Sequence, residues 1–375
     1  MAKAVAVVDL AHASLFSKLT GQTSSSISLT RLTARLQLGG IETYLISCPD
    51  QLRIAHALAA LTDVLLCCVG LEQFQSSKSS RHFTDLMTRH FVLGIKAAVV
   101  CINDPLSQQT FNEAADQVRD TFRKVGFQAS NCFVLPVSCS AEHNLQSRST
   151  AFDYYSGACV MEVLGSLAQP PRPAGSFLFA VAERHSRPGA VVCCGRVLRG
   201  DVKVGDVVSL APGLQRCPVL SVGYFGQLVS SAKAGDLCGL ALGNVLLEDV
   251  LRGSVLSAGE DCREVAAFEG QMIVLAEQVK WGYEGTLYAH CARVPVRVER
   301  IKHLIDRRSG VVMEQLPAEV QRGKAAVVRI VPKTPLAVGV FSKAPHFGRF
   351  FITNSKACEV VGVVRCITEP GLMGD

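Results

Sequence analysis

The sequence lacks the long apolar runs and short repeats that mark several protein classes. No stretch of eighteen apolar residues occurs, so we expect neither a transmembrane helix nor a membrane partner. The first thirteen residues are apolar, but Asp9 interrupts them, which favours a buried first strand over a signal peptide. No repeat of solenoid period is visible. These absences predict a soluble, cytoplasmic protein.

Fifteen cysteines are present, but their spacing matches neither a metal site nor a redox pair. The sequence has no Cys-x-x-Cys and no Cys/His cluster with zinc spacing. Cys67-Cys68 and Cys193-Cys194 are adjacent pairs in apolar runs, where neighbours on a strand point to opposite faces. We therefore expect small buried side chains in a reducing compartment, and no metal site.

The composition that remains is that of folded domains. Apolar residues make up 49% of the 375 residues and charged residues 19%, a globular balance. This length allows two or three domains, each with its own core. The net charge of +6 is mild, so it permits an acidic or nucleic-acid partner without requiring one.

Short apolar runs alternate with helical patterns in the first part of the chain. The helical patterns are Leu52–Leu61 and Gln109–Val125, and the second has apolar residues at three- and four-residue spacing. Strands that alternate with helices indicate a parallel sheet with covered faces. The expected strands are Ala4–Val8, Thr43–Ser47, Val64–Val69, Ala97–Ile102 and Phe133–Val137.

The pattern changes near Gln169–Pro173, where three prolines in four residues predict a linker. Beyond it, glycine turns separate short strand patterns, as in a small antiparallel barrel. A second change near Cys262–Ala267 precedes another β-rich stretch with Val/Ile runs. The prediction is a multidomain α/β plus all-β chain. It has an α/β domain over residues 1–170 and antiparallel β-barrels over residues 175–262 and 264–375.

The two predicted barrels carry the most specific motifs. Gly195–Asp206 reads GRVLRGDVKVGD, and two tight turns follow from its glycines. Further motifs are Ala234–Asp236 (AGD), Leu251–Gly253 (LRG), Ile305–Gly310 (IDRRSG) and Phe347–Phe350 (FGRF). Each alone is a hairpin, and their order and spacing carry the information.

With these motifs the chain resembles domains two and three of the elongation factor Tu / elongation factor 1-alpha superfamily of translational GTPases. The IDRRSG and FGRF stretches look like elongation factor 1-alpha. The stretch Asn144–Ser149 looks more like the Hbs-type ribosome-rescue factor. The resemblance implies that the first domain is a truncated P-loop-GTPase-like domain, a parallel sheet with helices.

The family's phosphate loop, GxxxxGK[ST], has no counterpart in this sequence. Glycine N–H groups of that loop close on the phosphates, Lys neutralises charge and Ser/Thr holds magnesium. The matching place is Asp9–Phe16, which contains no glycine and has Leu15 and Phe16 where Lys and Ser/Thr belong. Loss of these groups removes several charge-assisted hydrogen bonds of about 1.5–3 kcal/mol each.

The two switch loops also depart from the family pattern. Ser28 stands where switch one has its magnesium-binding Thr, although a polar start of a strand explains it as well. Switch two, DxPGH in the family, keeps Pro49 and has Gln51 in place of the His that positions the attacking water. We therefore expect no catalytic residue, with Gln51 as the residue at the ancestral water position.

The two loops that recognise the guanine base in the family are matched only in part. The NKxD loop keeps Asn103 but has Leu106 where the family's Asp accepts hydrogen bonds from guanine. Ser138 remains in the last loop. Ser28, Pro49, Asn103 and Ser138 are therefore predicted as vestigial nucleotide-binding positions, and the two last also fit plain turn residues.

Cations alternate with Val and Ile before the second barrel's charged turn, as on a strand with one basic face. Such a face is either solvated or contacts RNA or another partner. The candidate contact residues are Arg293, Arg297, Arg300, Lys302, Arg307, Arg308 and Arg349.

The expected function is that of an elongation factor 1-alpha-like pseudo-GTPase, a binding factor in translation, ribosome rescue or mRNA surveillance, without a bound cofactor. The implied partners are the ribosome, a tRNA-like or release-factor-like protein, or RNA-decay machinery. Two alternatives stay open. One is a working translational GTPase that binds GTP and Mg²⁺ at an unusual site, and the other is a structural subunit of a larger complex.

Overall fold

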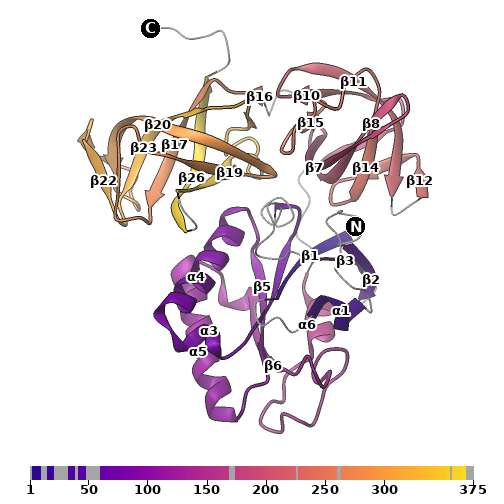
Figure 1. Ribbon diagram of the computed structural model, residues 1–375, viewed down its shortest axis with the longest axis vertical. Coiled ribbons are helices and arrows are strands. Elements are labelled where there is room, and N and C mark those ends of the chain that lie inside the picture. Colours follow the sequence, from indigo (N-terminus) through magenta and orange to yellow (C-terminus); the bar gives the residue numbers. More distant parts are fainter. Residues whose placement is uncertain are drawn as a thin grey trace. The chain divides into compact units, whose positions relative to one another are not determined.

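A computed structural model describes residues 2–9, 15–20, 33–38, 41–47, 60–168, 174–224, 227–259, 263–354 and 357–368. The chain divides into two compact units, Met1–Pro171 and Arg172–Asp375 (Figure 1). In the described ranges, no helix is both long enough and apolar enough to cross a membrane. The helical pattern at residues 52–59 and the proline-rich stretch at residues 169–173 lie outside these ranges.

The first unit is built on a six-stranded sheet in the order β2-β3-β1-β4-β5-β6. All neighbours run parallel except β2, which is antiparallel to β3. The strands are β1 (Ala2–Asp9), β2 (Thr33–Leu38), β3 (Ile41–Ser47), β4 (Val64–Val69), β5 (Ala97–Asn103) and β6 (Cys132–Val137). The five predicted strands are confirmed, and β2 was not predicted.

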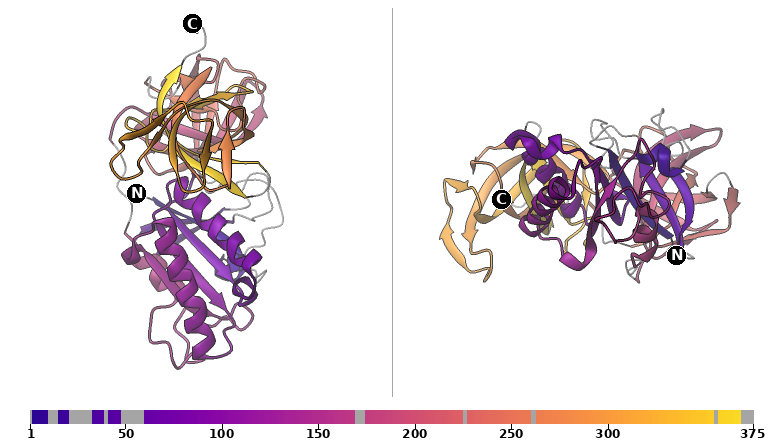
Figure 2. Two further views of the ribbon diagram at one scale, coloured as in Figure 1. Left: turned by 90° about the vertical axis from the view of Figure 1, so that its left-hand side faces the viewer. Right: turned by 90° about the horizontal axis from the view of Figure 1, so that it is seen from below.

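Helices cover both faces of this sheet. They are α1 (Leu15–Thr20), α3 (Glu72–Gln75), α4 (Ser77–Val92), α5 (Gln108–Val125) and α6 (Val160–Ser166), with a 3₁₀ turn at Ala129–Asn131. α1 and α6 lie on one side of the sheet, and α3, α4 and α5 lie on the other (Figure 1). The left view of Figure 2 looks onto this second group, with the strands behind it.

The predicted helix at Gln109–Val125 is confirmed as α5, and its ends have clear physical causes. The Ser107 hydroxyl accepts from the backbone N–H of Thr110, and the Thr110 side chain caps the Ser107 N–H in return. The helix stops at Gly126, whose φ of 105° is left-handed.

The second unit begins with a closed six-stranded antiparallel barrel. Its strands follow the order β10-β15-β7-β8-β14-β11, and the pairing of β10 with β11 closes the ring. They are β7 (Leu178–Arg187), β8 (Ala190–Arg199), β10 (Val207–Ala211), β11 (Gln215–Tyr224), β14 (Leu237–Leu242) and β15 (Val255–Ser257). Three short strands accompany them: β9 (Asp201–Lys203), β12 (Gln227–Val229) and β13 (Ser231–Lys233).

Two turns of the first barrel share one construction. In Lys203–Asp206 and again in Lys233–Asp236, the Asp carboxylate accepts from the Lys backbone N–H at 2.8 Å. A glycine precedes the Asp in each case, with φ of 94° at Gly205 and 100° at Gly235. The turn predicted at Gly205-Asp206 is confirmed.

A second closed six-stranded antiparallel barrel follows. Its order is β19-β25-β26-β17-β23-β20, closed by the pairing of β19 with β20. The strands are β17 (Ala267–Val274), β19 (Glu284–Ala289), β20 (Ala292–Ile305), β23 (Ala325–Pro332), β25 (Arg349–Thr353) and β26 (Cys358–Thr368). Shorter strands are β16 (Arg263–Glu264), β18 (Gln278–Lys280), β21 (Val312–Gln315), β22 (Glu319–Gln321) and β24 (Ala337–Val338). The predicted class, a parallel sheet with helices followed by two barrels, is confirmed.

The two barrels touch within the second unit. Gly253 lies so close to Ala292 that a β-carbon on the glycine would fall 2.3 Å from the Ala292 Cα. The backbone N–H of Gly213 donates to Glu264 Oε2 at 2.9 Å. The LRG glycine of the first barrel is therefore a contact point for the second.

The cysteines behave as small buried side chains. None in the described part forms a disulfide, and among them Cys366 alone is exposed. Burial raises the pKa of Cys193 to about 12 and that of Cys194 to about 11, so these groups stay protonated thiols. No group of three or more His, Cys, Asp or Glu side chains in the same ranges is placed to hold a metal ion.

Candidate functional site

The predicted nucleotide positions are described only in part. Ser28, Pro49 and Gln51 lie outside the described residues, whereas Asn103 and Ser138 lie within them. Asn103 ends β5 and Ser138 follows β6. Because β5 and β6 are parallel neighbours, the loops at their carboxyl ends lie side by side. Ligands of open α/β sheets bind at this end of the strands.

Leu15 is the residue that the sequence analysis matched to the Lys of the family's phosphate loop. It begins α1, and its side chain is completely buried. It packs in the same core cluster as Val7 of β1 and Leu19 of α1. A side chain buried in this core offers no hydrogen-bond donor or positive charge to a phosphate.

Asn103 uses both ends of its side-chain amide inside the protein. Its Oδ1 accepts from the backbone N–H of Cys139 at 3.0 Å, and its Nδ2 donates to Asp104 Oδ2 at 2.8 Å. Asp104 has a left-handed φ of 47°, and its N–H donates to the Val137 carbonyl. Asn103 therefore joins the loops after β5 and β6.

Ser138 is a turn residue in this arrangement. Its Oγ accepts from the backbone N–H of Ala141 at 3.2 Å and lies 3.2 Å from Ser140 Oγ. Its backbone forms two hydrogen bonds with His143 that close the loop. These contacts stabilise the loop. They fit the alternative given in the sequence analysis, that Ser138 is a turn residue.

Helix α1 is tied to the segment that follows Ser138. Lys18 Nζ lies 2.8 Å from Glu142 Oε1, and this hydrogen bond is the main cause that lowers the pKa of Glu142. Gln146 Nε2 donates to the Leu19 carbonyl at 3.3 Å. Both contacts connect α1 to the loop that follows β6.

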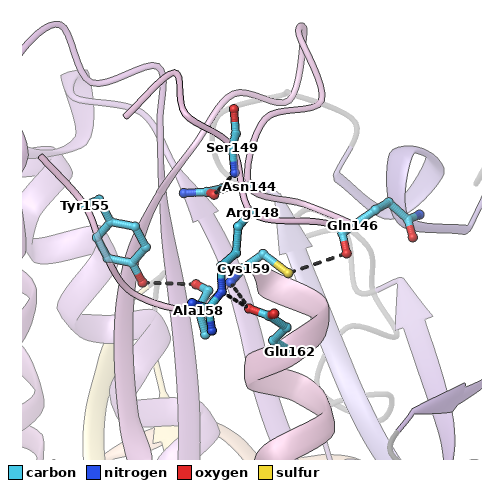
Figure 3. Close-up of polar contacts among 8 residues, drawn as sticks. All are labelled: Asn144, Gln146, Arg148, Ser149, Tyr155, Ala158, Cys159 and Glu162. Carbon is cyan, nitrogen blue, oxygen red and sulfur yellow. Dashed lines mark hydrogen bonds and ion pairs between the residues drawn. The ribbon is translucent and has the colours of Figure 1, made fainter. Parts of the chain in front are cut away.

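The stretch that resembles the Hbs type, Asn144–Ser149, is held by its own polar groups (Figure 3). Asn144 Oδ1 accepts from the Ser149 N–H at 3.0 Å, and Asn144 Nδ2 donates to the Pro136 carbonyl. Cys159 Sγ donates to the Gln146 carbonyl at 3.5 Å. These contacts satisfy backbone groups of a loop, which is a structural role.

Helix α6 starts in the same network. Glu162 Oε2 accepts from the Cys159 backbone N–H at 3.0 Å and from Arg148 Nε at 2.8 Å (Figure 3). The hydrogen bond from Arg148 and then that from Cys159 lower the pKa of Glu162. The carboxylate therefore serves as a helix cap and ion-pair partner, and its lowered pKa is the opposite of what a general acid needs.

The basic strand predicted in the second barrel is β20. Val294, Val296 and Val298 are buried, whereas Arg293 and Arg297, at the alternate positions, are exposed. The predicted alternation is confirmed. An irregularity in the pairing with β23 lies between Val298 and Arg300, and Arg300 is exposed next to the exposed Glu299.

The candidate cations do not form one cluster in space. β20 has 14 residues at about 3.3 Å each, so Arg293 near its start lies far along the strand from Arg307, which follows its end at Ile305. Arg293 Nε donates to the Tyr288 hydroxyl at 3.2 Å, and Lys302 forms an ion pair with Glu269. Arg349 lies over the Phe341 ring at 5.0 Å, and burial lowers its pKa. Sequence proximity therefore overstated the grouping.

Arg307 and Arg308 are brought together with a cation that the sequence did not single out. They line a pocket of about 600 Å³ with Lys324, and its apolar lining includes Met313 and Ala325. Lys324 reaches the pocket because Ala325 of β23 pairs with Ile305 of β20. The Gly323-Lys324 pair, which reads as a turn before a strand, was the only sequence signal.

Two parts of the chain match known family models. Residues 190–257 match elongation factor Tu domain 2, and residues 267–365 match the GTP-eEF1A C-terminal domain-like family. The elongation factor 1-alpha of Tetrahymena pyriformis is 30% identical over 287 residues, which cover 73% of this chain and 66% of that protein. That of Plasmodium falciparum is 30% identical over 292 residues, covering 75% and 66%. The chain thus spans 66% of the length of these relatives.

Solved structures of translation factors share the fold. The elongation factor SelB of Methanococcus maripaludis, in complex with the GTP analogue GppNHp, has a TM-score of 0.72 at 17% identity. The match covers 99% of this chain and 81% of that one. A bacterial selenocysteine-specific elongation factor has a TM-score of 0.68 at 14% identity, over 97% of this chain and 58% of that one. At these identities the similarity concerns the fold.

Proposed function

The chain belongs to the translational GTPase superfamily, and on this premise we propose that it is a cytoplasmic pseudo-GTPase of the elongation factor 1-alpha type that binds partners without hydrolysing GTP. The burial of Leu15 carries this proposal. A core leucine at the place of the phosphate-loop Lys leaves the triphosphate without its counter-charge. The internal use of both ends of the Asn103 amide supports the same conclusion.

We propose that the chain binds the ribosome, a tRNA-like or release-factor-like protein, or RNA-decay machinery. Both closed barrels are complete, so a binding role survives the loss of the nucleotide loops. The exposed arginines of β20 offer a surface for RNA, since phosphate contacts supply most of the affinity that does not depend on sequence. We propose ribosome rescue or mRNA surveillance as the process in which this binding role is used.

Ribosome co-sedimentation of charge-reversal variants tests this proposal. We expect the triple change Arg293→Glu, Arg297→Glu and Arg300→Glu to weaken association with ribosomes and to flatten its salt dependence. The matched control reverses Arg119 and Arg123 on α5, which are exposed cations of the first unit. Thermal unfolding confirms that each variant is folded.

The outcomes separate the open alternatives. Equal loss in both variants, or no loss in either, contradicts a role for the β20 face. An assembly in cell lysate whose size is unchanged by ribonuclease favours the structural-subunit alternative.

A further inference from the structure

The hairpin formed by β20 and β21 carries a row of exposed apolar side chains. Val311, Met313 and Leu316 are more than half exposed, at 63%, 62% and 51%, and Val312 is exposed at 43%. Contiguous exposed apolar residues on a soluble domain mark interaction surfaces more often than chance surface positions do. This row follows directly on the charged turn that contains Arg307 and Arg308.

Trp281 extends this row at its far end. Its Nε1–H donates to the Pro317 carbonyl at 2.8 Å, which places the indole beside the residue that follows Leu316. The polar atom of the ring is thus satisfied within the protein, while 47% of the side chain remains exposed. A tryptophan whose ring is fixed and exposed is the type of residue that dominates binding energy at interfaces.

β21 is also an edge strand. Within the described residues it pairs with β20 alone, so its other side presents backbone N–H and C=O groups without a neighbouring strand. Met313 is an extra residue at a β-bulge, because Val312 pairs with Ile305 and Glu314 with Leu304. An unpaired strand edge is a template on which an extended peptide adds as a further strand, and the bulge restricts this addition to the residues on either side of Met313.

The pocket beside this edge is positively charged. Arg307, Arg308 and Lys324 line it, and Asp306 is its one acidic lining residue. Asp306 Oδ1 already accepts from the Arg308 and Ser309 N–H groups and from the Ser309 hydroxyl. The carboxylate is thus engaged in its own turn, and the excess charge of the pocket is positive.

We propose that this surface, formed by β21, Trp281 and the Arg307/Arg308/Lys324 pocket, binds an extended segment of a partner protein in which an acidic residue lies beside apolar ones. The segment adds to the edge of β21, its apolar side chains cover the exposed row, and its carboxylate enters the pocket. A nucleic acid fits less well, because a phosphate backbone would leave the apolar row uncovered. The inference rests on the proposed function, since it specifies the kind of partner that a non-hydrolysing factor recruits.

Selection from a random peptide library tests this inference on the full-length protein. A displayed library of twelve-residue peptides is selected on the wild-type protein, with counter-selection on the double variant Arg307→Glu/Arg308→Glu. We expect enrichment of peptides that combine Asp or Glu with β-branched or aromatic residues. Selected peptides should bind the double variant and Val312→Lys at least about tenfold more weakly, which corresponds to about 1.4 kcal/mol. The control variant Arg119→Glu/Arg123→Glu should bind them as the wild type does.

Hydrogen exchange adds a readout for strand addition. The amides of β21 should exchange fast in the full-length protein and become protected when a selected peptide is added. Three results overturn the inference: no compositional enrichment, peptides that bind the double variant as tightly as the wild type, or amides of β21 that are protected before any peptide is present. The last result would mean that another part of the chain covers the edge.

A single-stranded RNA twelve-mer serves as the competing probe. If it binds the wild type more tightly than the selected peptides and loses this binding in the double variant, the surface is an RNA site and the inference is wrong. None of these results depends on nucleotide binding, so failure here is distinguishable from failure of the pseudo-GTPase proposal.

Discussion

The side-chain oxygen of Asn103 accepts the backbone N–H of Cys139 at 3.0 Å, across a separation of 36 residues. This contact joins the loops after β5 and β6, which the sequence analysis matched to the family's base-reading loops. The rest of the Asn103 amide donates to Asp104. Asn103, which we predicted as a vestigial nucleotide-binding position, therefore connects two loops of the protein through its side chain.

Asn103→Ala should destabilise the first unit. Removal of the acceptor leaves the N–H of Cys139, a buried residue, without its partner, which costs about 1–3 kcal/mol. Denaturant unfolding measures the free energy of unfolding. Leu106→Ala, at a side chain that is 86% exposed, is the control and should change it by less than about 0.5 kcal/mol. Equal free energies of unfolding for the two variants would contradict a structural role for Asn103.

Gly253→Ala should destabilise the second unit more than Gly205→Ala does. Both glycines have left-handed φ, 86° and 94°, so each substitution costs about 1–2 kcal/mol in backbone strain. A β-carbon at Gly205 meets nothing within 4 Å, whereas one at Gly253 meets the Ala292 backbone. The overpacking adds about 1–3 kcal/mol at Gly253. Thermal unfolding of the two variants compares them, and equal shifts would contradict the barrel contact.

His290 should make the second unit sensitive to acid. Burial lowers its pKa from 6.5 to about 4, and its Nε2–H donates to the Ala337 carbonyl. As the pH falls, the unfolded chain takes up the proton on His290 before the folded protein does. The free energy of unfolding therefore decreases between pH 6.5 and pH 4, and His290 causes no further change below pH 4. The loss amounts to about 3 kcal/mol, at about 1.4 kcal/mol per pKa unit.

His290→Asn separates this contribution from those of carboxylates. Asn tolerates the left-handed φ of 39° at this position and does not titrate. The difference in unfolding free energy between wild type and variant should shrink between pH 6.5 and pH 4. A constant difference over this range would show that His290 is not kept neutral by burial.

The sequence predicted most of the first sheet but missed β2 and, among the described helices, α1, α3, α4 and α6. The pattern for α4 was present, since Phe83, Leu86 and Met87 are buried at three- and four-residue spacing. The polar start of the helix, residues 76–80, obscured it. β2 pairs antiparallel with β3, and no long apolar run marks it. The Gly39-Gly40 pair between the two segments is a hairpin signal in the sequence that the prediction did not use.

The barrels were predictable from their turns, whereas the arrangement of their side chains was not. Cations close in sequence along β20 are separated in space because a strand extends, and Lys324 joins Arg307 only through the pairing of β20 with β23. Local spacing does not contain such long-range pairings. The same reason hides the contact between Trp281 and Pro317.

The central claim, loss of the nucleotide site, is tested most directly by titration with a fluorescent GTP analogue, with and without Mg²⁺ and with the matching ATP analogue as control. With the phosphate-loop Lys replaced by buried Leu15, we predict no saturable, Mg²⁺-dependent binding up to about 100 μM. Saturable binding of the GTP analogue that requires Mg²⁺ and is not reproduced by the ATP analogue would contradict the account, and would identify the chain as a working translational GTPase with an unusual site.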